Sequence, residues 1–150
     1  MKQYGPWLAA RIFMGTVFAY AGYAKLMEPY ENFRGAIAHY EVIPYVLTGP
    51  IARILPWFEI FFGVFLILGY LPRVSALALA FFSFCFLIVL GSSNVLFEGG
   101  GKDCGCFGEN GPIHLTVQQV FFLDLLNFFL GVKLYSLKEH PLSLERWLTA

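Results

Sequence analysis

Charged side chains are scarce in this sequence. Asp, Glu, Lys and Arg make up 13% of its 150 residues, whereas they make up about a quarter of an average soluble domain. This scarcity argues against a soluble globular domain. The ten basic and ten acidic residues also cancel, and there is no basic tract. The composition therefore gives no general attraction to nucleic acid or acidic lipid, and we expect no nucleic-acid partner.

Histidine and cysteine are also few, at three residues each. His39, His114 and His140 are too far apart in the sequence to form a pair of metal ligands on one helix. We therefore interpret them as loop histidines and expect no metal.

Apolar residues, in contrast, make up 58% of the chain. A hydrocarbon core of about 30 Å needs about twenty mostly apolar residues per helix, and four such windows lie between polar breaks. An exposed sheet cannot sit in lipid. We therefore predict an all-α fold, an integral membrane four-helix bundle that forms a single membrane domain. The domain covers residues 1–150, with spans at about 6–27, 51–70, 74–93 and 116–135.

Lysine and arginine predict the orientation of these spans. With four spans both termini share a side, and a modest excess of positive charge marks that side as cytoplasmic. The outer loop 94–115 is then extracytoplasmic, where disulfides persist, and residues 136–150 form an inner tail. Arg11 interrupts the first window, so we expect a retained span rather than a cleaved signal peptide. The inner side collects Lys2, Arg73, Lys133, Lys138 and Arg146, the outer side Lys25, Arg34 and Lys102, and Arg53 lies at the border.

The connection between the first two spans is amphipathic. Phe33, Ile37 and Tyr40 have helical spacing, which predicts a short helix on the membrane surface. We expect Pro44 and Pro50 to break the chain after it.

Small residues mark the expected contacts between spans, because they let helix backbones approach closely. In the first span they share one helical stripe with Arg11 and Lys25, and that stripe should face the bundle. The small residues are Gly15, Ala19, Gly22, Gly63 and Gly131.

Two carboxylates lie inside apolar windows, Glu59 in PWFEIFFG and Asp124 in FFLDLLNFFLG. A charge at the membrane centre costs about 2.5–3.5 kcal/mol on insertion scales, so both should face the interior. Each lies about 12 Å below the outer surface, so they should be level. We expect an interior polar site there, the alternative being a structural hydrogen-bonded pair. Arg11 is the nearest candidate cation, unless it snorkels to the cytoplasmic headgroups, whereas Lys25 should snorkel or pair with Glu28.

The most unusual motif is Cys104-Gly105-Cys106, in the polar outer loop. A bridge between cysteines one residue apart is strained and therefore easily reduced, which favours disulfide exchange over permanent stapling. Two alternatives stay open, namely an inert structural bridge and a soft-metal site held by the two thiolates. The third cysteine, Cys85, lies within an apolar span, and we interpret it as a small buried hydrophobe.

These features resemble the DoxX and MauE group of small four-span bacterial membrane proteins. The more specific part is Cys104-Gly-Cys-Phe-Gly108 after the third span. The resemblance implies a bundle similar to vitamin K epoxide reductase, a bacterial cell membrane location, and a role in thiol redox or in maturing exported proteins. The chain departs from the reductase pattern, because it has Cys-x-Cys in a loop and no Cys-x-x-Cys in a helix. The other matching residues are Arg11, Gly15, Phe18, Ala21, Gly22, Lys25, Leu26, Pro56, Glu59, Gly63, Leu66, Gly69 and Arg73.

We therefore predict a membrane thiol-disulfide redox protein or redox maturation factor, of the thiol:quinone oxidoreductase type. Cys104 and Cys106 would exchange with an extracytoplasmic thiol protein or small thiol, and electrons would pass to a membrane quinone. Glu59 or Asp124 would serve as the proton donor. The alternatives are a non-catalytic assembly subunit for a partner enzyme and a small-solute carrier. The quinone slot, an apolar site with a few polar groups, is assigned to Arg11, Phe58, Phe62 and Phe81.

Overall fold

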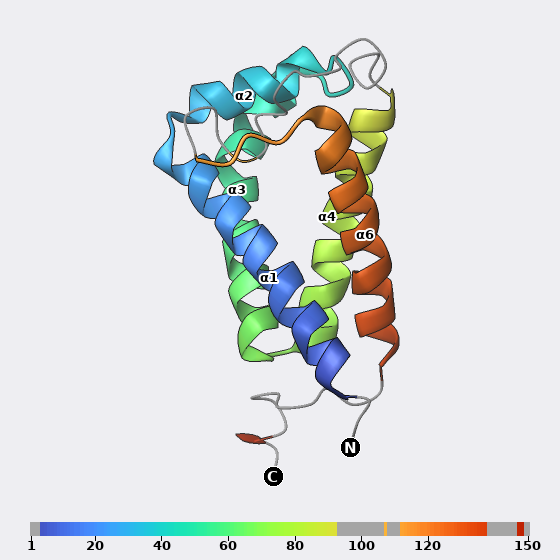
Figure 1. Ribbon diagram of the computed structural model, residues 1–150. Helices are drawn as coiled ribbons and strands as arrows, with labels where there is room; N and C mark the ends of the chain where they lie inside the picture. The colour runs from blue at the N-terminus through green and yellow to red at the C-terminus, as the bar shows by residue number, and fades with distance from the viewer. Residues whose placement is uncertain (1–3, 93–106, 108–111, 138–146, 149–150) are drawn as a thin grey trace.

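The computed structural model describes residues 4–92, 107, 112–137 and 147–148. The described elements are all α-helices, which confirms the predicted all-α class. Four of them are long and lie alongside one another, and the fifth, α2, lies across one end of the others (Figure 1). The helices are α1 (Tyr4–Met27), α2 (Tyr30–His39), α3 (Tyr45–Leu68), α4 (Pro72–Ser92) and α6 (Val117–Ser136).

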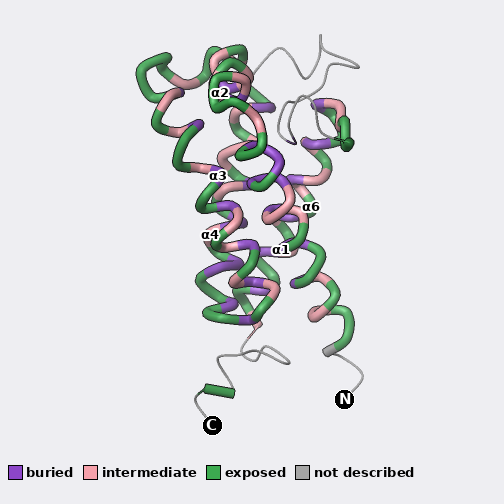
Figure 2. Tube along the Cα trace, turned by 90° about the vertical axis from the view of Figure 1, so that its left-hand side faces the viewer, coloured by how far each residue is buried: buried purple, intermediate pink, exposed green. Residues whose placement is uncertain are grey.

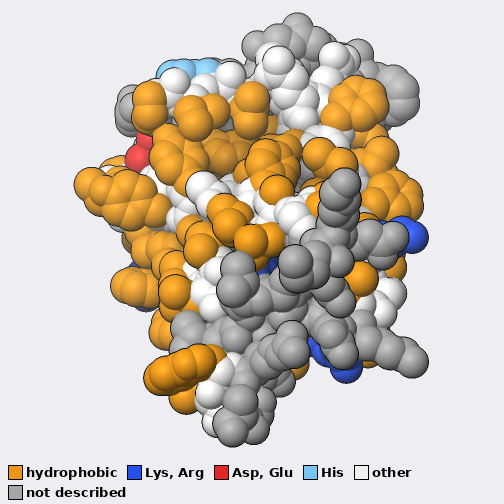
Figure 3. Space-filling model, turned by 60° about the horizontal axis from the view of Figure 1, so that its bottom comes forward, with side chains coloured by type: hydrophobic (Ala, Val, Ile, Leu, Met, Phe, Trp, Pro, Cys, Tyr) orange, Lys and Arg blue, Asp and Glu red, His pale blue; other side chains and the backbone are white. Residues whose placement is uncertain are grey.

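Within the described residues, three helices are long and apolar enough to cross a membrane: α3, α4 and α6. Large apolar side chains point outward from them, such as Phe61, Phe81 and Phe122, which are 56%, 59% and 68% exposed. Buried residues lie toward the inside of the bundle (Figure 2), and apolar side chains cover much of the surface in Figure 3. Such a surface is stable in lipid rather than in water. The chain is a multi-pass membrane protein.

The second span begins earlier than the sequence predicted. Pro44 does end the preceding segment, because it is the N-cap of α3, but Pro50 lies inside that helix together with Pro56. The prediction that Pro50 breaks the chain is wrong. Each proline removes only one backbone hydrogen bond, and helices in lipid tolerate this where neighbouring helices pack against them.

The α1–α3 contact depends on glycine. A Cβ atom added to Gly63 would lie 2.8 Å from the backbone nitrogen of Ala19 and 2.8 Å from the carbonyl oxygen of Gly15. One added to Gly22 would lie 2.6 Å from the carbonyl oxygen of Pro56. The two backbones therefore touch, and there is no space for a side chain between them. This confirms that the stripe of small residues forms a helix contact.

A second close contact joins α6 to α4. A Cβ atom on Gly131 would lie 2.7 Å from the Cβ of Ala80 and 3.0 Å from the carbonyl oxygen of Ala76. At the end away from α2, the Nε of Arg73 donates a hydrogen bond of 3.2 Å to the carbonyl oxygen of Leu137. Four long helices are thus held as two tight pairs, α1 with α3 and α4 with α6.

Helix α2 is amphipathic, as predicted. Phe33 and Ile37 are buried and pack in one cluster with Ala52 of α3. On the polar side, the Nε of Arg34 donates to the hydroxyl of Thr48 at 3.3 Å. The Arg34 guanidinium also lies 4.5 Å from the ring centroid of Tyr45. These contacts fasten α2 across the start of α3.

Candidate functional site

A buried ion pair joins α1 to α3. The Nζ of Lys25 donates to both carboxylate oxygens of Glu59, at 2.8 and 2.7 Å, and the two side chains are 2% and 1% exposed. The Gly22–Pro56 contact lies one turn away and brings the two backbones together. Side chains on a helix lean toward its N-terminus, so Lys25 and Glu59 lean toward each other from these antiparallel helices. The contact that requires glycine therefore also positions the ion pair.

Two aromatic rings surround the ammonium group. The Lys25 Nζ lies 4.8 Å from the centroid of Phe33 and 5.2 Å from that of Phe86. Aromatic faces attract a cation electrostatically, and the effect grows where water is excluded. In place of water, the Lys25 ammonium therefore contacts one carboxylate and two ring faces. These contacts offset part of the free-energy cost of desolvating a buried ion pair.

Asp124 of α6 completes a polar cluster with this pair. It is 7% exposed, and together with Lys25 and Glu59 it lines a cavity of about 20 Å³, which is enough for about one water molecule. We call Lys25, Glu59 and Asp124 the polar triad. The expectation that Glu59 and Asp124 meet at one level of the interior is confirmed. Two carboxylates face one ammonium, so the triad has one negative charge in excess when all three groups are ionised. One proton or cation beyond Lys25 would balance that charge.

The cation in this cluster is not the one that the sequence indicated. Arg11 lies 14 residues before Lys25 on α1, about 21 Å of helical rise, and it is 3% exposed, so it neither reaches Glu59 nor lies on the surface. Lys25 does not snorkel to the headgroups. The sequence did contain evidence for Lys25 as the partner of Glu59, because Lys25 shares the inward stripe and lies in the same outer half as Glu59. Its position near the end of the helix instead favoured the prediction that it snorkels or pairs with Glu28.

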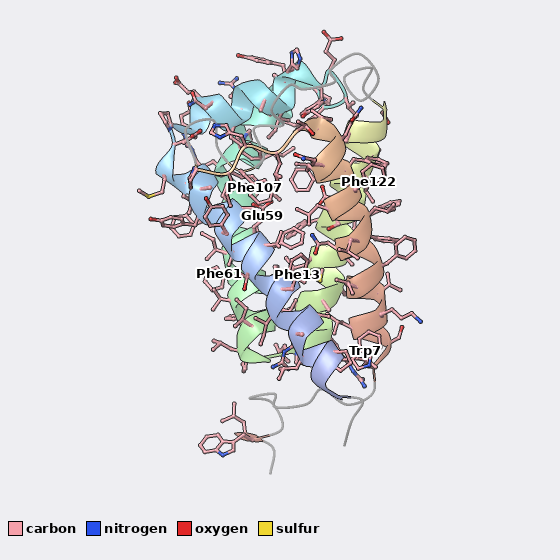
Figure 4. All side chains as sticks on the ribbon, viewed as in Figure 1. Trp7, Phe13, Glu59, Phe61, Phe107 and Phe122 are labelled. Carbon is pink, nitrogen blue, oxygen red and sulfur yellow. The ribbon has the colours of Figure 1, made fainter. Side chains whose placement is uncertain are left out.

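Within the stretch 93–111 one residue is described, and it lies against this site. Phe107 is 9% exposed, its ring stacks on Tyr20 of α1 with centroids 6.2 Å apart, and it lines the same cavity as the polar triad. Figure 4 shows Phe107 and Glu59 in the half of the bundle nearer α2. Phe107 directly follows Cys106 in the sequence. Cys104 and Cys106 themselves lie outside the described residues.

A larger, apolar cavity of about 290 Å³ lies beside the polar triad. Of the residues assigned to a quinone slot, Phe81 lines it. Phe58 is 46% exposed on the outer face of α3, and Phe62 packs on the core cluster at the other end of the bundle. Cys85, interpreted as a small buried hydrophobe, is half-buried and also lines this cavity.

The family described as "Methylamine utilisation protein MauE" matches residues 4–135. A relative named "Methylamine utilization protein MauE" from Methylophilus methylotrophus is 31% identical over an alignment of 150 positions, which covers 94% of this chain and 74% of the relative. One of the same name from Paracoccus denitrificans is 33% identical over 99 residues, which cover 66% of this chain and 52% of the relative. No solved structure matches the chain.

The family match runs from the first residue of α1 to one residue before the end of α6. It therefore includes all three members of the polar triad, Phe107 and the Cys-Gly-Cys motif. The chain belongs to the MauE family.

Proposed function

We propose that this chain is a membrane accessory protein of methylamine utilisation that acts by thiol-disulfide exchange through Cys104 and Cys106. The names of its relatives support the biological setting. The chemistry is supported by one observation above all: Phe107, the neighbour of Cys106, lines the cavity that also holds Lys25, Glu59 and Asp124.

In this proposal α1 also spans the membrane, in addition to α3, α4 and α6. Its 24 residues rise about 36 Å, enough to cross the hydrocarbon core. Its two charges disfavour a lipid-facing helix, but Lys25 is neutralised by Glu59 and Arg11 is buried. With four spans, the distribution of Lys and Arg puts both termini in the bacterial cytoplasm and the Cys-Gly-Cys loop outside the inner membrane.

The exchange step transfers two electrons. A thiolate of an extracytoplasmic partner attacks one sulfur of the Cys104–Cys106 disulfide, and a mixed disulfide forms. The partner's second thiolate then displaces the cysteine, so the partner gains a disulfide and Cys104 and Cys106 become thiols. The two protons of the partner's thiols end on these two sulfurs. A membrane quinone, as electron acceptor, would take two electrons and two protons from the cysteines and so restore their disulfide.

The polar triad would serve the proton part of this cycle. Its excess carboxylate binds a proton in the interior, where two uncompensated negative charges would be costly. The small cavity lined by Asp124 and Lys25 is large enough for about one water molecule, which would give that proton a hydrogen-bonded route. The roles of Glu59 and Asp124 are therefore to hold and release protons for the reaction of the cysteines.

Thiol trapping on isolated membranes tests the proposal. Alkylation with a mass-tagged maleimide should show Cys104 and Cys106 cycling between oxidised and reduced forms as the redox conditions change. Replacing both with serine should abolish maturation of the partner enzyme, whereas the matched Cys85→Ser variant should keep it. A pair that stays oxidised under every condition, with maturation intact in the double serine variant, would leave the chain as a non-catalytic assembly subunit. Solute flux that survives loss of the cysteines but not Glu59→Gln would instead indicate a carrier.

A further inference from the structure

The larger cavity lies where α2, α3 and α4 meet. Helices α3 and α4 are joined by a short link and separate toward the end covered by α2 (Figure 1). All three helices contribute to its lining, with Ile51 and Leu55 from α3, Phe82 from α4 and Ile37 from α2. A cavity of about 290 Å³ results, about twice the volume of an engineered apolar cavity that binds benzene. It has room for one substituted six-membered ring and the start of a tail.

The lining selects an uncharged ligand. The side chains around the cavity are aliphatic or aromatic, apart from the Cys85 thiol and the Tyr40 hydroxyl. Burial raises the pKa of Tyr40 above its ordinary value, so this group stays a neutral hydroxyl near pH 7. No charged group touches the cavity among the described residues, and a charged ligand would therefore lose its hydration without compensation.

The aromatic content of the wall favours a ring over an acyl chain. Phe33, Tyr40, Phe81, Phe82 and Phe86 all line the cavity, and aromatic rings gain from offset or edge-to-face contact with another ring. Phe81 is also 59% exposed on the outside of α4, where the surrounding medium is lipid. A ligand would therefore reach the cavity from the membrane.

The cavity shares a wall with the polar triad. Phe86 lines both this cavity and the small one that contains Glu59 and Asp124. Phe33 and Phe86, on which the Lys25 ammonium lies, are both in the cavity wall. A ring held here would be one aromatic side chain away from the Lys25–Glu59 pair, and Phe107 lines the small cavity together with Phe86.

From this arrangement we infer that the cavity between α2, α3 and α4 is the binding site for the ring of a membrane quinone. This inference rests on the proposed function for the identity of the acceptor. The balance is that of a dithiol oxidation: Cys104 and Cys106 lose two electrons and two protons and form one S–S bond, and the quinone gains both electrons and both protons at its two carbonyl oxygens. This quinone site differs from the one predicted from the sequence, because it lies between α2, α3 and α4. Of the four residues predicted to form the slot, Phe81 is the one that lines this cavity.

Protection of Cys85 tests binding directly. In the full chain carrying Cys104→Ser and Cys106→Ser, Cys85 is the remaining cysteine, and its alkylation by N-ethylmaleimide reports on the cavity. The probe is tetramethyl-p-benzoquinone, whose fully substituted ring adds no thiol. At about ten times its dissociation constant it should slow alkylation about tenfold. Short-chain phosphatidylcholine, the competing source of an apolar group, should not. Equal rates with and without the quinone, or equal protection by the phospholipid, would overturn the inference.

A second measurement uses the wild-type cysteines. Ala36→Trp should fill the cavity from α2 and abolish quinone reduction by a dithiol, while Leu77→Trp, on the outward face of α4, should leave it within about twofold, as expected for a surface substitution. Normal reduction by Ala36→Trp would contradict the site. The two proposals fail separately: Cys85 protection without cysteine cycling refutes only the proposed function, and cycling without protection refutes only this inference.

Discussion

The buried Lys25–Glu59 pair makes a quantitative prediction about stability. Lys25→Met keeps the length of the side chain but removes its charge, and it leaves the Glu59 carboxylate 1% exposed without its two hydrogen bonds. Breaking a buried pair from one side costs about 3–5 kcal/mol, because an uncompensated charge remains in the interior. Glu59→Met should cost less than Lys25→Met, because the Lys25 ammonium keeps Asp124 in the same cavity and the rings of Phe33 and Phe86 beside it.

The double variant Lys25→Met/Glu59→Met should be less damaging than Lys25→Met alone, because it leaves one buried carboxylate, Asp124, where Lys25→Met leaves two. Replacing a whole buried pair by apolar residues of similar volume is often neutral or stabilising, so the coupling between the two sites should offset most of the combined loss. The measurement is reversible unfolding in mixed detergent and SDS micelles, followed by circular dichroism. Lys133→Met, at an exposed site near the end of α6, is the matched control and should change the free energy of unfolding by about 0.5 kcal/mol or less. Additive losses in the double variant would refute the reasoning.

Three further predictions follow from single contacts. Gly63→Ala should destabilise the protein by about 1–3 kcal/mol, because its Cβ would lie 2.8 Å from two backbone atoms of α1. The control is Gly35→Ala, whose Cβ meets nothing within 4 Å and which should be neutral or stabilising. Equal effects of the two variants in a detergent unfolding series would contradict the α1–α3 contact. Phe107→Ala should slow cysteine cycling, because it removes the ring that stacks on Tyr20, and Phe107→Leu should keep part of the rate. Unchanged thiol-trapping kinetics in the alanine variant would show that the Phe107 ring plays no part in the cycling. Thr116→Ala removes the capping-box hydrogen bond to Gln119 and should destabilise the start of α6 by about 1 kcal/mol. Hydrogen exchange should then show faster exchange of the amides near Val117. Unchanged protection of these amides would contradict the cap.

The sequence was most informative where one physical requirement dominates. Crossing lipid needs about twenty apolar residues, and the windows drawn on that rule lie within a few residues of α1, α4 and α6. The glycine contacts were also predictable, because Gly15 and Gly22 are seven residues apart and so lie on one face of the helix, and neither position has room for a side chain. The depth of Glu59 and Asp124 brought both to one cavity for the same geometric reason.

Features that depend on two distant segments were less predictable. The partner of Lys25 lies 34 residues away, and the sequence contains no local sign of which cation a carboxylate meets. The start of α3 at Tyr45 was missed because Pro50 has the same local signature in a loop as in a tolerated helical position. The large cavity arises from how α2 crosses the α3–α4 pair, so a slot assigned from aromatic density alone retained only Phe81.

The central claim is that Cys104 and Cys106 pass electrons from a thiol donor to a membrane acceptor. Quinone reduction by a dithiol, measured with the purified full chain beside its Cys106→Ser variant, tests this most directly. The account predicts turnover by the wild-type chain and none above the uncatalysed rate for Cys106→Ser. Equal rates for the two proteins would contradict it.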